Sequence, residues 1–312
     1  MSSKRKASGQ QSGRSSFWIC KSLEKTLCDI CTTPLDGPYL KYDHKFFPCR
    51  VSMCKSCGLV KLNPRWLANK YRKFYTKHYD HFYRDLKKNI EELFEDDLAS
   101  KGQVLKERLR NVPFPEKVKM LDVGAGTGFA FLTLPESVDV KSFAIETSDK
   151  CLPFLKSRGI TIQGSDFSDN FGQNYDFVVT RHVLEHVLDP IRFLKDIRQS
   201  LKDTGYVYIA VPNAKYFNLD KAHSFFRHIH TYYFNPKTLQ LVCEAAGLFP
   251  FKIGHNGDIW AILQKTRTDD HPIPDISPEE QLNSVNKYLD HSHQPLKRRV
   301  KGFLRRLYYR AF

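Results

Sequence analysis

The amino-acid sequence predicts an α/β fold built on a mostly parallel sheet, with a small cysteine-rich module ahead of it. Three observations lead to this prediction. Short β-rich runs alternate with helical stretches between residues 118 and 265, which is typical of a parallel sheet with crossover helices. A glycine-rich turn follows the first of these runs. Two Cys-x-x-Cys pairs stand close together near the N-terminal end, a spacing typical of a zinc site.

Changes in composition along the 312 residues predict the domain organisation. The Ser-, Lys- and Gly-rich start has no apolar core of a secretory signal. Apolar residues with helical spacing, from Ile90 to Leu98, predict helices ahead of a boundary at Pro113. We expect a disordered tail at 1–23, a zinc-binding module at 24–65, a helical connector or substrate cap at 66–112, the α/β domain at 113–265, a linker at 266–294 and a basic amphipathic helix at 295–312.

The charge of the chain indicates an anionic partner. The formal net charge is +15 at pH 7, which favours a nucleic acid, a phospholipid or a nucleotide-linked or polyanionic glycan. Residues 295–312 combine one apolar helical stripe with many Lys and Arg side chains, a pattern that suits an anionic membrane surface, the protein's own core or RNA. No apolar run approaches the roughly 18–20 residues of a membrane span. We therefore expect a cytoplasmic protein with a peripheral membrane contact through this helix.

The cysteine pairs Cys28/Cys31 and Cys54/Cys57 can form the two knuckles of a tetrahedral zinc site. In a chain without a secretory signal, such pairs indicate metal binding in a reducing compartment rather than disulfides. A site with four thiolates leaves no position for a water molecule. The predicted zinc is therefore structural.

The glycine-rich turn is the strongest local indication of a ligand. The run Val118–Val123 is followed by Gly124, Gly126 and Gly128. Glycines at such a turn let the backbone approach a ligand and aim N–H groups at it. The spacing departs from the dinucleotide pattern G-x-G-x-x-G, because the third glycine comes one residue early and position 129 is Phe. Asp122 also places a carboxylate two residues before the first glycine.

This pattern resembles motif I of the class I S-adenosylmethionine-dependent methyltransferases, which have a Rossmann-like fold with a mostly parallel seven-stranded sheet. Later strand ends follow in the order of that family over residues 118–265. The resemblance implies S-adenosylmethionine as cofactor, with Glu146 on the ribose, Asp166 on the adenine amino group and Phe167 against the ring. The implied cofactor-binding residues are Asp122, Gly124, Gly126, Gly128, Glu146, Asp166, Phe167 and Arg181.

The string from His182 to His186 reads H-x-x-E-H, which also matches a zinc-protease signature. Two histidines at i and i+4 can share a metal on one helix face. Here, however, the string follows a fourth strand beyond the glycine turn, a context that a protease does not need. In many methyltransferases of the resembled class the same string continues into Asp-Pro, as Asp189-Pro190 does here. That resemblance places His182 closest to the ligand, and Glu185 and His186 could equally support the start of a helix.

A second histidine string, His228-Ile-His230, precedes a stretch that resembles the C-terminal part of sugar and small-molecule methyltransferases. In the sugar C-methyltransferase branch, a histidine matching His230 acts as base or acid. That branch has Glu where this chain has Ile229, so an O-methyl acceptor stays open. Methyl transfer needs donor and acceptor in line and a base for an acceptor proton. We expect His230 first and His182 second as catalytic residues; a histidine that only caps a helix is the alternative for His230.

The residues after the second cysteine pair resemble the zinc-binding part of methyltransferases from polysaccharide, lipopolysaccharide and antibiotic-sugar pathways. The two resemblances imply substrate contacts by Tyr75, Tyr79, His228 and Tyr233. We therefore expect a methyltransferase that acts on a sugar hydroxyl or carbon of a nucleotide- or lipid-linked glycan. RNA or another small molecule is the second enzymatic hypothesis, with nucleic acid ranked below glycan. A module that binds S-adenosylmethionine without catalysis is the third.

Overall fold

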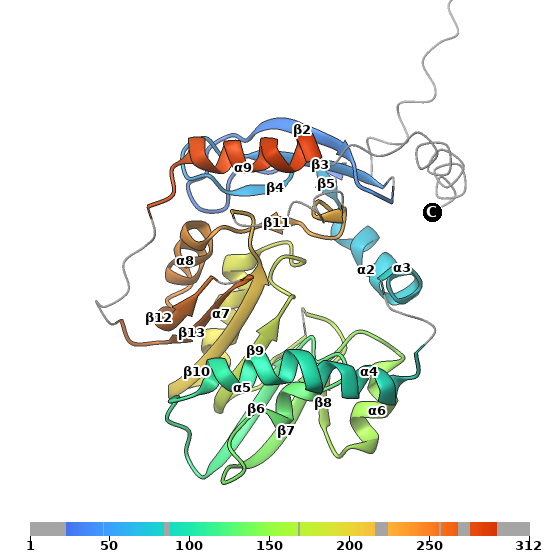
Figure 1. Cartoon of the computed structure of the whole chain (residues 1–312), viewed down its shortest axis with the longest axis vertical. Coiled ribbons are helices and arrows are strands. Elements are labelled where there is room, and N and C mark those ends of the chain that lie inside the picture. Colours follow the sequence, from blue (N-terminus) through green and yellow to red (C-terminus); the bar gives the residue numbers. More distant parts are fainter. Residues whose placement is uncertain are drawn as a thin grey trace, which may run out of the picture.

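The computed structural model describes residues 23–45, 47–83, 88–167, 169–215, 224–255, 257–267 and 275–291. The expected tail up to residue 22 and the basic helix at 295–312 lie outside the described residues. A large sheet with its helices forms one end of the described part, and a small sheet with α9 (Pro278–His291) forms the other (Figure 1). No helix among the described residues combines the length and apolar character that crossing a membrane requires.

The large sheet has seven strands in the order β12-β13-β10-β9-β6-β7-β8. Strand β13 runs antiparallel to β10 and β12, and the remaining neighbours are parallel. This confirms the predicted mostly parallel seven-stranded sheet. Its strands are β6 Lys117–Val123, β7 Asp139–Ile145, β8 Thr161–Gly164, β9 Tyr175–Arg181, β10 Leu201–Pro212, β12 Phe249–Gly254 and β13 Asp258–Gln264.

The order in which the chain adds strands to the sheet reverses at β6, while the strands themselves stay parallel there. The chain passes from β6 to β7 and β8 on one side and then returns to β9 on the other side. Ligands of such sheets bind outside the carboxyl ends of the strands at this reversal point. The loops that follow β6 and β9 carry the glycine turn and the first histidine string. The fold therefore brings these two motifs to the same edge.

Helices cover both faces of the large sheet. Phe94 and Leu105, from the helices between residues 90 and 109, pack on one face, and Phe193 and Leu239 pack on the other. Part of the predicted connector is thus built into the core of the α/β domain. The helices are α4 Ile90–Asp97, η1 Leu98–Gly102, α5 Gln103–Leu109, α6 Cys151–Ser157, α7 Pro190–Ser200 and α8 Pro236–Ala245.

The chain forms only one short helical turn directly after the glycine turn. Only Phe129–Leu132 (η2) is helical, and it is a 3₁₀ turn. The Thr133 hydroxyl donates to the Ala130 carbonyl at 2.7 Å. Pro135 follows two residues later, and a proline disfavours helical backbone at the residue before it. The chain therefore leaves the turn without a long helix.

The cysteine-rich module forms a small sheet that the α/β domain completes. The order of strands is β11-β4-β3-β2. Strand β11 pairs antiparallel with β4, with Tyr232 opposite Lys61 and Tyr233 opposite Val60. The four strands are β2 Asp36–Tyr42, β3 Pro48–Met53, β4 Val60–Leu62 and β11 Tyr232–Tyr233, and β1 Leu23–Glu24 pairs separately with β5 Arg65–Trp66. The two parts of the chain are therefore joined through backbone hydrogen bonds.

Buried charges strengthen this junction. Lys61 is fully buried; its ammonium pairs with Asp29 and lies 4.9 Å from the centre of the Tyr232 ring. Arg65 donates to the Leu188 carbonyl at 2.7 Å and to the Tyr232 hydroxyl at 3.3 Å. The Tyr232 hydroxyl in turn donates to the Leu188 carbonyl at 3.0 Å. Buried charges need such partners, so this network fixes the module against the α/β domain.

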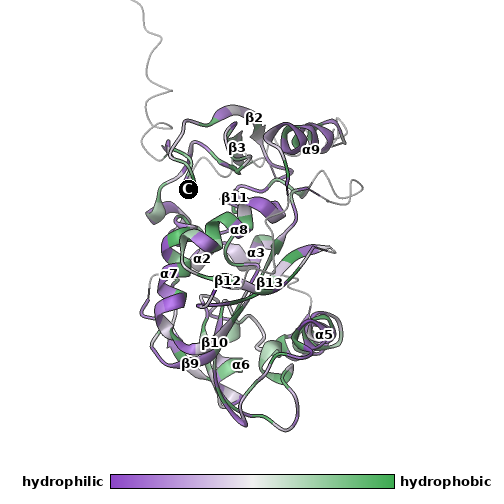
Figure 2. Cartoon of the chain, turned by 90° about the vertical axis from the view of Figure 1, so that its left-hand side faces the viewer, coloured by the Kyte–Doolittle hydropathy of each residue, from purple (hydrophilic) through white to green (hydrophobic). Residues whose placement is uncertain are grey.

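The segment predicted as a linker at 266–294 contains a packed helix. Helix α9 lies along the small sheet (Figure 1) and mixes hydrophilic and hydrophobic residues (Figure 2). Its Val285 and Tyr288 are buried against Phe225 and Phe226. The Gln281 side chain accepts a hydrogen bond from the Asn235 side chain at 2.7 Å. The expectation of a linker over this whole range was wrong, because apolar residues at helical spacing inside a Pro- and Asp-rich segment find a surface to cover.

Replacing Tyr232 with Phe should weaken the junction. The change removes a hydroxyl that serves Arg65, Lys61 and the Leu188 carbonyl. We expect the free energy of unfolding to fall by about 1–3 kcal/mol, because each of these buried groups loses one of its hydrogen bonds. Urea unfolding measures this. Tyr206→Phe is the matched control, since the Tyr206 ring packs on Phe251; an equal loss in both variants would contradict the role of the Tyr232 hydroxyl.

Candidate functional site

The glycine turn has the backbone conformation that a close ligand contact requires. Gly124, Gly126 and Gly128 have φ angles of 78°, 57° and 77°, which side chains rarely adopt. A Cβ atom at Gly124 would lie 2.4 Å from Cγ2 of Val183. A Cβ atom at Gly126 would meet no atom within 4 Å. The first glycine is therefore fixed by packing, while the second borders open space.

Glu146 supports this turn from the end of β7. Its carboxylate accepts the Gly126 N–H at 2.6 Å and the Ser148 N–H at 2.7 Å. The residue is buried. A carboxylate has about four acceptor positions, so two backbone bonds orient Glu146 and leave it able to accept hydroxyl groups. This arrangement is compatible with the predicted ribose contact.

Asp122 is a buried acid at the end of β6. Burial raises the pKa of its carboxyl to about 8, the nearby Glu146 carboxylate adds to this shift, and Arg181 opposes it. A positively charged ligand close to Asp122 would favour the ionised form. The position therefore suits a cationic group, as the sequence predicts.

The remaining predicted cofactor residues lie at the same edge of the sheet. A ring carbon of Phe167 comes within 3.8 Å of the Cβ position of Gly124. Asp166 follows β8 and lies 3.8 Å from the Arg72 guanidinium of α2 (Ala68–Lys77). Arg181, at the end of β9, pairs with Asp258 at 3.4 Å. The contact from Arg72 brings the cap helix to this edge, which the sequence alone did not indicate.

His182 is held by two carboxylates. Its Nδ1 lies 3.2 Å from Glu185 Oε1 and its Nε2 lies 3.0 Å from Asp258 Oδ2. Burial lowers the pKa of His182, but the bonds to Asp258 and Glu185 outweigh this and raise it. Because ionised carboxylates only accept hydrogen bonds, both ring nitrogens face acceptors, and His182 orients these two carboxylates rather than serving as a free base.

The H-x-x-E-H string does not lie on a helix. Residues 182–186 form a turn, and α7 begins only at Pro190, where the Asp189 side chain accepts the Arg192 N–H. His182 and His186 consequently do not share a helix face as a protease zinc site would need. Instead, His186 faces His230 across 4.8 Å between ring centres, with the rings at 81°. The sequence singled out His230 but did not indicate this pairing, which joins two distant strings.

His230 is buried, and its Nδ1 has no hydrogen-bond partner among the described residues. Burial holds the pKa of His230 well below its ordinary value, and neighbouring His186 and Arg227 lower it further. The ring is therefore neutral near pH 7 and retains a lone pair. Of the two expected catalytic histidines, His230 has the nitrogen that remains available.

The predicted substrate residues divide into two groups. His228 pairs with Asp43 at 2.8 Å, and the Tyr233 hydroxyl donates to the Arg227 carbonyl at 2.8 Å. Both are buried, so these contacts fix the loop that carries His230. Tyr75 and Tyr79, from α2 and α3 (Tyr79–Tyr83), lie with ring centres 5.3 Å apart. The Tyr75 hydroxyl reaches His186 Nδ1 at 2.9 Å, so the cap contributes directly to the histidine pair.

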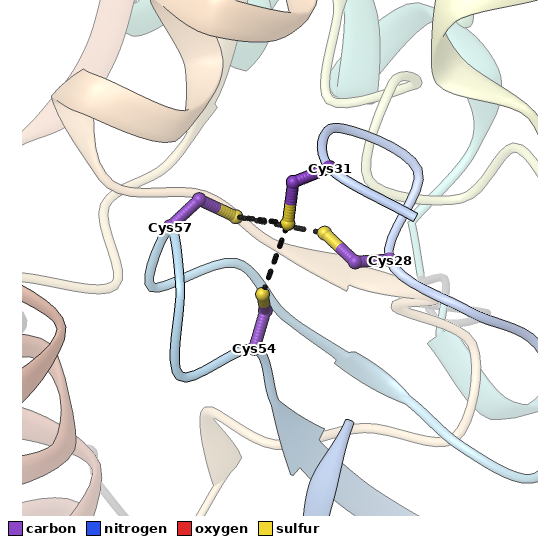
Figure 3. A group of neighbouring side chains, drawn as sticks. All are labelled: Cys28, Cys31, Cys54 and Cys57. Atoms are coloured by element: carbon purple, nitrogen blue, oxygen red, sulfur yellow. Dashed lines mark hydrogen bonds between the residues drawn. The ribbon is translucent and has the colours of Figure 1, made fainter. Parts of the chain in front are cut away.

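The four predicted metal ligands converge (Figure 3). The sulfur of Cys31 lies 3.3 Å from that of Cys54 and 3.9 Å from that of Cys57, and Cys28 lies 3.5 Å from Cys57. Zinc–sulfur bonds of about 2.3 Å in a tetrahedron place sulfurs about 3.8 Å apart. The cluster therefore fits a tetrahedral zinc ion. The other described cysteines, Cys49, Cys151 and Cys243, are buried and do not belong to this group of ligand atoms.

Comparison with known families identifies the class of protein. A family model described as a methyltransferase domain matches residues 75–249. This match covers more than half of the chain, so the protein belongs to this family of methyltransferases and uses S-adenosylmethionine as methyl donor. The match begins well before the predicted boundary at 113, in line with the packing of α4 and α5 on the large sheet.

A curated relative is the ubiquinone biosynthesis O-methyltransferase of Parvibaculum lavamentivorans. It is 27% identical over 124 residues, which cover 36% of this chain and 46% of the relative. The chain thus spans less than half the length of that relative.

Solved structures with a similar fold include a methyltransferase from Thermotoga maritima described as a possible histamine N-methyltransferase. It has 15% identity and a TM-score of 0.47, covering 62% of this chain and 100% of that chain. The N,N-8-amino-8-demethyl-D-riboflavin dimethyltransferase of Streptomyces davawensis has 18% identity and a TM-score of 0.46, covering 60% of this chain and 62% of that chain.

Two alanine substitutions should separate packing from donor binding. Both Gly124→Ala and Gly126→Ala place a side chain at positive φ, which costs about 1–2 kcal/mol. Gly124→Ala also forces Cβ against the stiff Val183 side chain, so we expect the greater loss of stability in urea unfolding. Gly126→Ala should lose only the about 1–2 kcal/mol of the positive-φ conformation but bind S-adenosylmethionine more weakly by calorimetry. Unchanged donor affinity in Gly126→Ala would contradict a ligand at this glycine.

Asp122→Asn should alter the dependence of stability on pH. Folding raises the pKa of Asp122 from 3.8 to about 8, so the folded chain holds a proton that the unfolded chain releases. Stability from this group is present below pH 3.8 and is lost as the pH rises towards 8. As the pH rises from 5 to 8, we expect the stability of Asp122→Asn to increase by about 3–4 kcal/mol relative to that of the native chain. Urea unfolding at both pH values tests this; the same difference at both would contradict the assigned shift.

Proposed function

We propose that the protein transfers a methyl group from S-adenosylmethionine to a sugar hydroxyl or carbon of a nucleotide- or lipid-linked glycan. The observation that carries this proposal is a tyrosine surface, formed by the rings of Tyr75, Tyr79 and Tyr83. This surface lies beside the histidine pair His186 and His230. Tyr75, Tyr79 and Tyr83 follow one another with ring centres 5.3 Å and 5.4 Å apart. Tyrosines present both apolar faces and hydroxyl groups, which match a sugar ring that carries C–H bonds and hydroxyls. The adjoining His230 supplies a nitrogen for the acceptor.

The chemistry follows from the positions of these groups. Asp122, Glu146 and the glycine turn hold the donor at the carboxyl edge of the sheet. Val183 packs on Gly124, and three residues further His186 meets His230. The acceptor site therefore adjoins the donor site through one short loop, which allows the in-line approach that methyl transfer needs. When an acceptor hydroxyl attacks the methyl carbon, the carbon–sulfur bond breaks and the hydroxyl proton passes to His230.

A hydroxyl acceptor fits this site better than a carbon acceptor. Ile229 is buried beside Tyr75 and offers no acid or base. A carbon acceptor would have to lose a proton from a much weaker acid, for which the chain would rely on His230 alone. Transfer to oxygen demands only that one base. We therefore place O-methylation ahead of C-methylation.

The second candidate is O-methylation of a small aromatic or other non-sugar molecule. It is favoured by the similarity to the curated relative, whose name is that of a ubiquinone biosynthesis O-methyltransferase. The tyrosine surface would accept an aromatic ring by stacking. Assays with both acceptor types decide between the two candidates.

The module and the basic end of the chain complete the proposal. We propose that Cys28, Cys31, Cys54 and Cys57 hold a structural zinc ion, supported by their tetrahedral spacing. A cytoplasmic enzyme on lipid-linked glycans would gain from an anionic membrane contact through residues 295–312, which the sequence pattern favours. Polysaccharide biosynthesis is the pathway class that fits such acceptors.

His230→Gln tests the proposed site. The substitution keeps a polar side chain but removes the imidazole, so we expect transfer to fall by about 10²–10⁴-fold while donor binding stays within a few-fold. Radiolabelled S-adenosylmethionine with panels of nucleotide sugars, lipid-linked glycans, phenols and RNA measures transfer. His81→Gln, on the exposed side of α3, is the control. Transfer to phenols alone would overturn the glycan assignment, and full activity of His230→Gln would overturn the site.

Removal of zinc should loosen the loop that carries His228 and His230 more than it loosens the donor site. Strand β11 pairs with β4 of the module, whereas β6 lies in the centre of the large sheet. A thiol-reactive mercurial should release the zinc, and metal analysis of the released fraction measures it. After its release, we expect faster hydrogen exchange at residues 224–234 and little change at 117–123. A cysteine cluster that holds no zinc, or equal exchange in both segments, would contradict this coupling.

A further inference from the structure

A second group of metal-ligand type lies outside the cysteine module. Glu185, His186 and His230 offer ligand atoms that all lie within 4.8 Å of one another. Glu185 and His186 come from the loop after β9, and His230 comes from the loop before β11. Their side chains are at most 9% exposed. Two imidazoles and one carboxylate form a common ligand set for divalent transition metals.

Two buried atoms of this group have no hydrogen-bond partner among the described residues. They are Oε2 of Glu185 and Nδ1 of His230. Burying a carboxylate oxygen or an imidazole nitrogen without a partner costs about 1–3 kcal/mol, and two such atoms in adjacent side chains indicate a ligand between them. The second oxygen of Glu185 is already occupied, because His182 Nδ1 lies 3.2 Å from it. His182 thereby orients the carboxylate and leaves Oε2 for the ligand.

The third side chain is also oriented for ligation. His186 Nδ1 lies 2.9 Å from the Ile229 carbonyl oxygen. A carbonyl only accepts, so Nδ1 carries the hydrogen and Nε2 keeps the lone pair in the neutral ring. The Tyr75 hydroxyl lies 2.9 Å from the same Nδ1 and donates to the Ile229 carbonyl at 3.3 Å. Histidine ligands of metals usually have this kind of support on the nitrogen that is not bound to the metal.

We propose that Glu185, His186 and His230 bind one divalent metal ion, separate from the zinc of the cysteine module. Metal bonds of about 2.0–2.2 Å place ligand atoms about 3–3.5 Å apart. The ligand atoms of the three side chains already lie within 4.8 Å of one another, so small changes in side-chain torsion angles bring them to this spacing. Oxygen and nitrogen ligands without sulfur suit Mn²⁺, Fe²⁺, Co²⁺ and Zn²⁺. Three protein ligands leave positions open for oxygen atoms of an acceptor.

The consequence for catalysis rests on the proposed function. A hydroxyl bound to such an ion has a lower pKa, so it loses its proton to solvent more readily. Its oxygen then forms the bond to the methyl carbon while the carbon–sulfur bond breaks, which releases S-adenosylhomocysteine. With the ion bound, the lone pair of His230 goes to the metal, so the acceptor proton leaves to solvent instead of passing to His230 as in the metal-free transfer described above. An acceptor with two adjacent oxygens would fit the open positions best.

Titration of the full-length, zinc-containing protein with Mn²⁺, followed by electron paramagnetic resonance, tests metal binding without donor or acceptor. We expect one Mn²⁺ per chain. Glu185→Gln and His230→Gln should each weaken binding at least about tenfold, as each removes one ligand. Glu146→Gln is the matched control: it removes a buried carboxylate at the donor site and should leave Mn²⁺ binding unchanged. Circular dichroism and zinc content confirm that each variant is folded.

A second measurement needs no variant. Electron spin-echo modulation of the bound Mn²⁺ should show nitrogen from directly bound imidazole. Absence of Mn²⁺ binding, absence of imidazole nitrogen, or binding in both ligand variants that is as tight as in the native protein would overturn the proposal. None of these results depends on methyl transfer, so failure here leaves the proposed acceptor untouched. Conversely, a protein that binds Mn²⁺ through imidazole but methylates no glycan would retain this site and lose only the acceptor assignment.

Discussion

The antiparallel pairing of β11 with β4 is the constraint on which the candidate site depends. Tyr232 and Tyr233 lie two and three residues after His230 and form an edge strand of the sheet in the cysteine module. The position of His230 is therefore set by the module as much as by the large sheet. Lys61, buried beneath the Tyr232 ring, adds an ion pair with Asp29 to the same contact. The module therefore helps to fix the loop that carries His230, beside which we propose the acceptor binds.

A second set of hydrogen bonds joins the two histidine strings. The Thr231 hydroxyl donates to the carbonyls of Glu185 and Val187 at 3.0 Å and 2.6 Å. The Tyr232 N–H donates to the Glu185 carbonyl at 3.1 Å. Since Val183 of the first string packs on Gly124, the donor turn, the first string and the second string form one continuous set of contacts. Such continuity is what in-line transfer requires, because small displacements of either partner reduce the rate.

The sequence predicted those features that depend on local pattern. The parallel strands, the glycine turn and the cysteine pairs each follow from spacing within a few residues, and the sheet and the cysteine cluster have the expected form. Features that depend on distant partners were not predictable. Asp258, which engages His182, lies 76 residues away, and Asp43, which engages His228, lies 185 residues away. Helix α9 was missed because its apolar spacing is short and its surroundings are rich in Pro and Asp.

The same residue type serves opposite purposes in the two strings because its surroundings differ. His182 lies between two carboxylates, and their negative charge raises its pKa in spite of burial. His230 lies near His186 and Arg227, so burial and positive neighbours act together and lower its pKa. The His182 ring holds Glu185 in place through the contact at 3.2 Å, and a neutral His230 presents a lone pair. The H-x-x-E-H string is therefore better understood as a support that fixes a carboxylate and a ring beside His230 than as a self-contained metal motif. The function of the string arises only when the loop before β11 is brought against it.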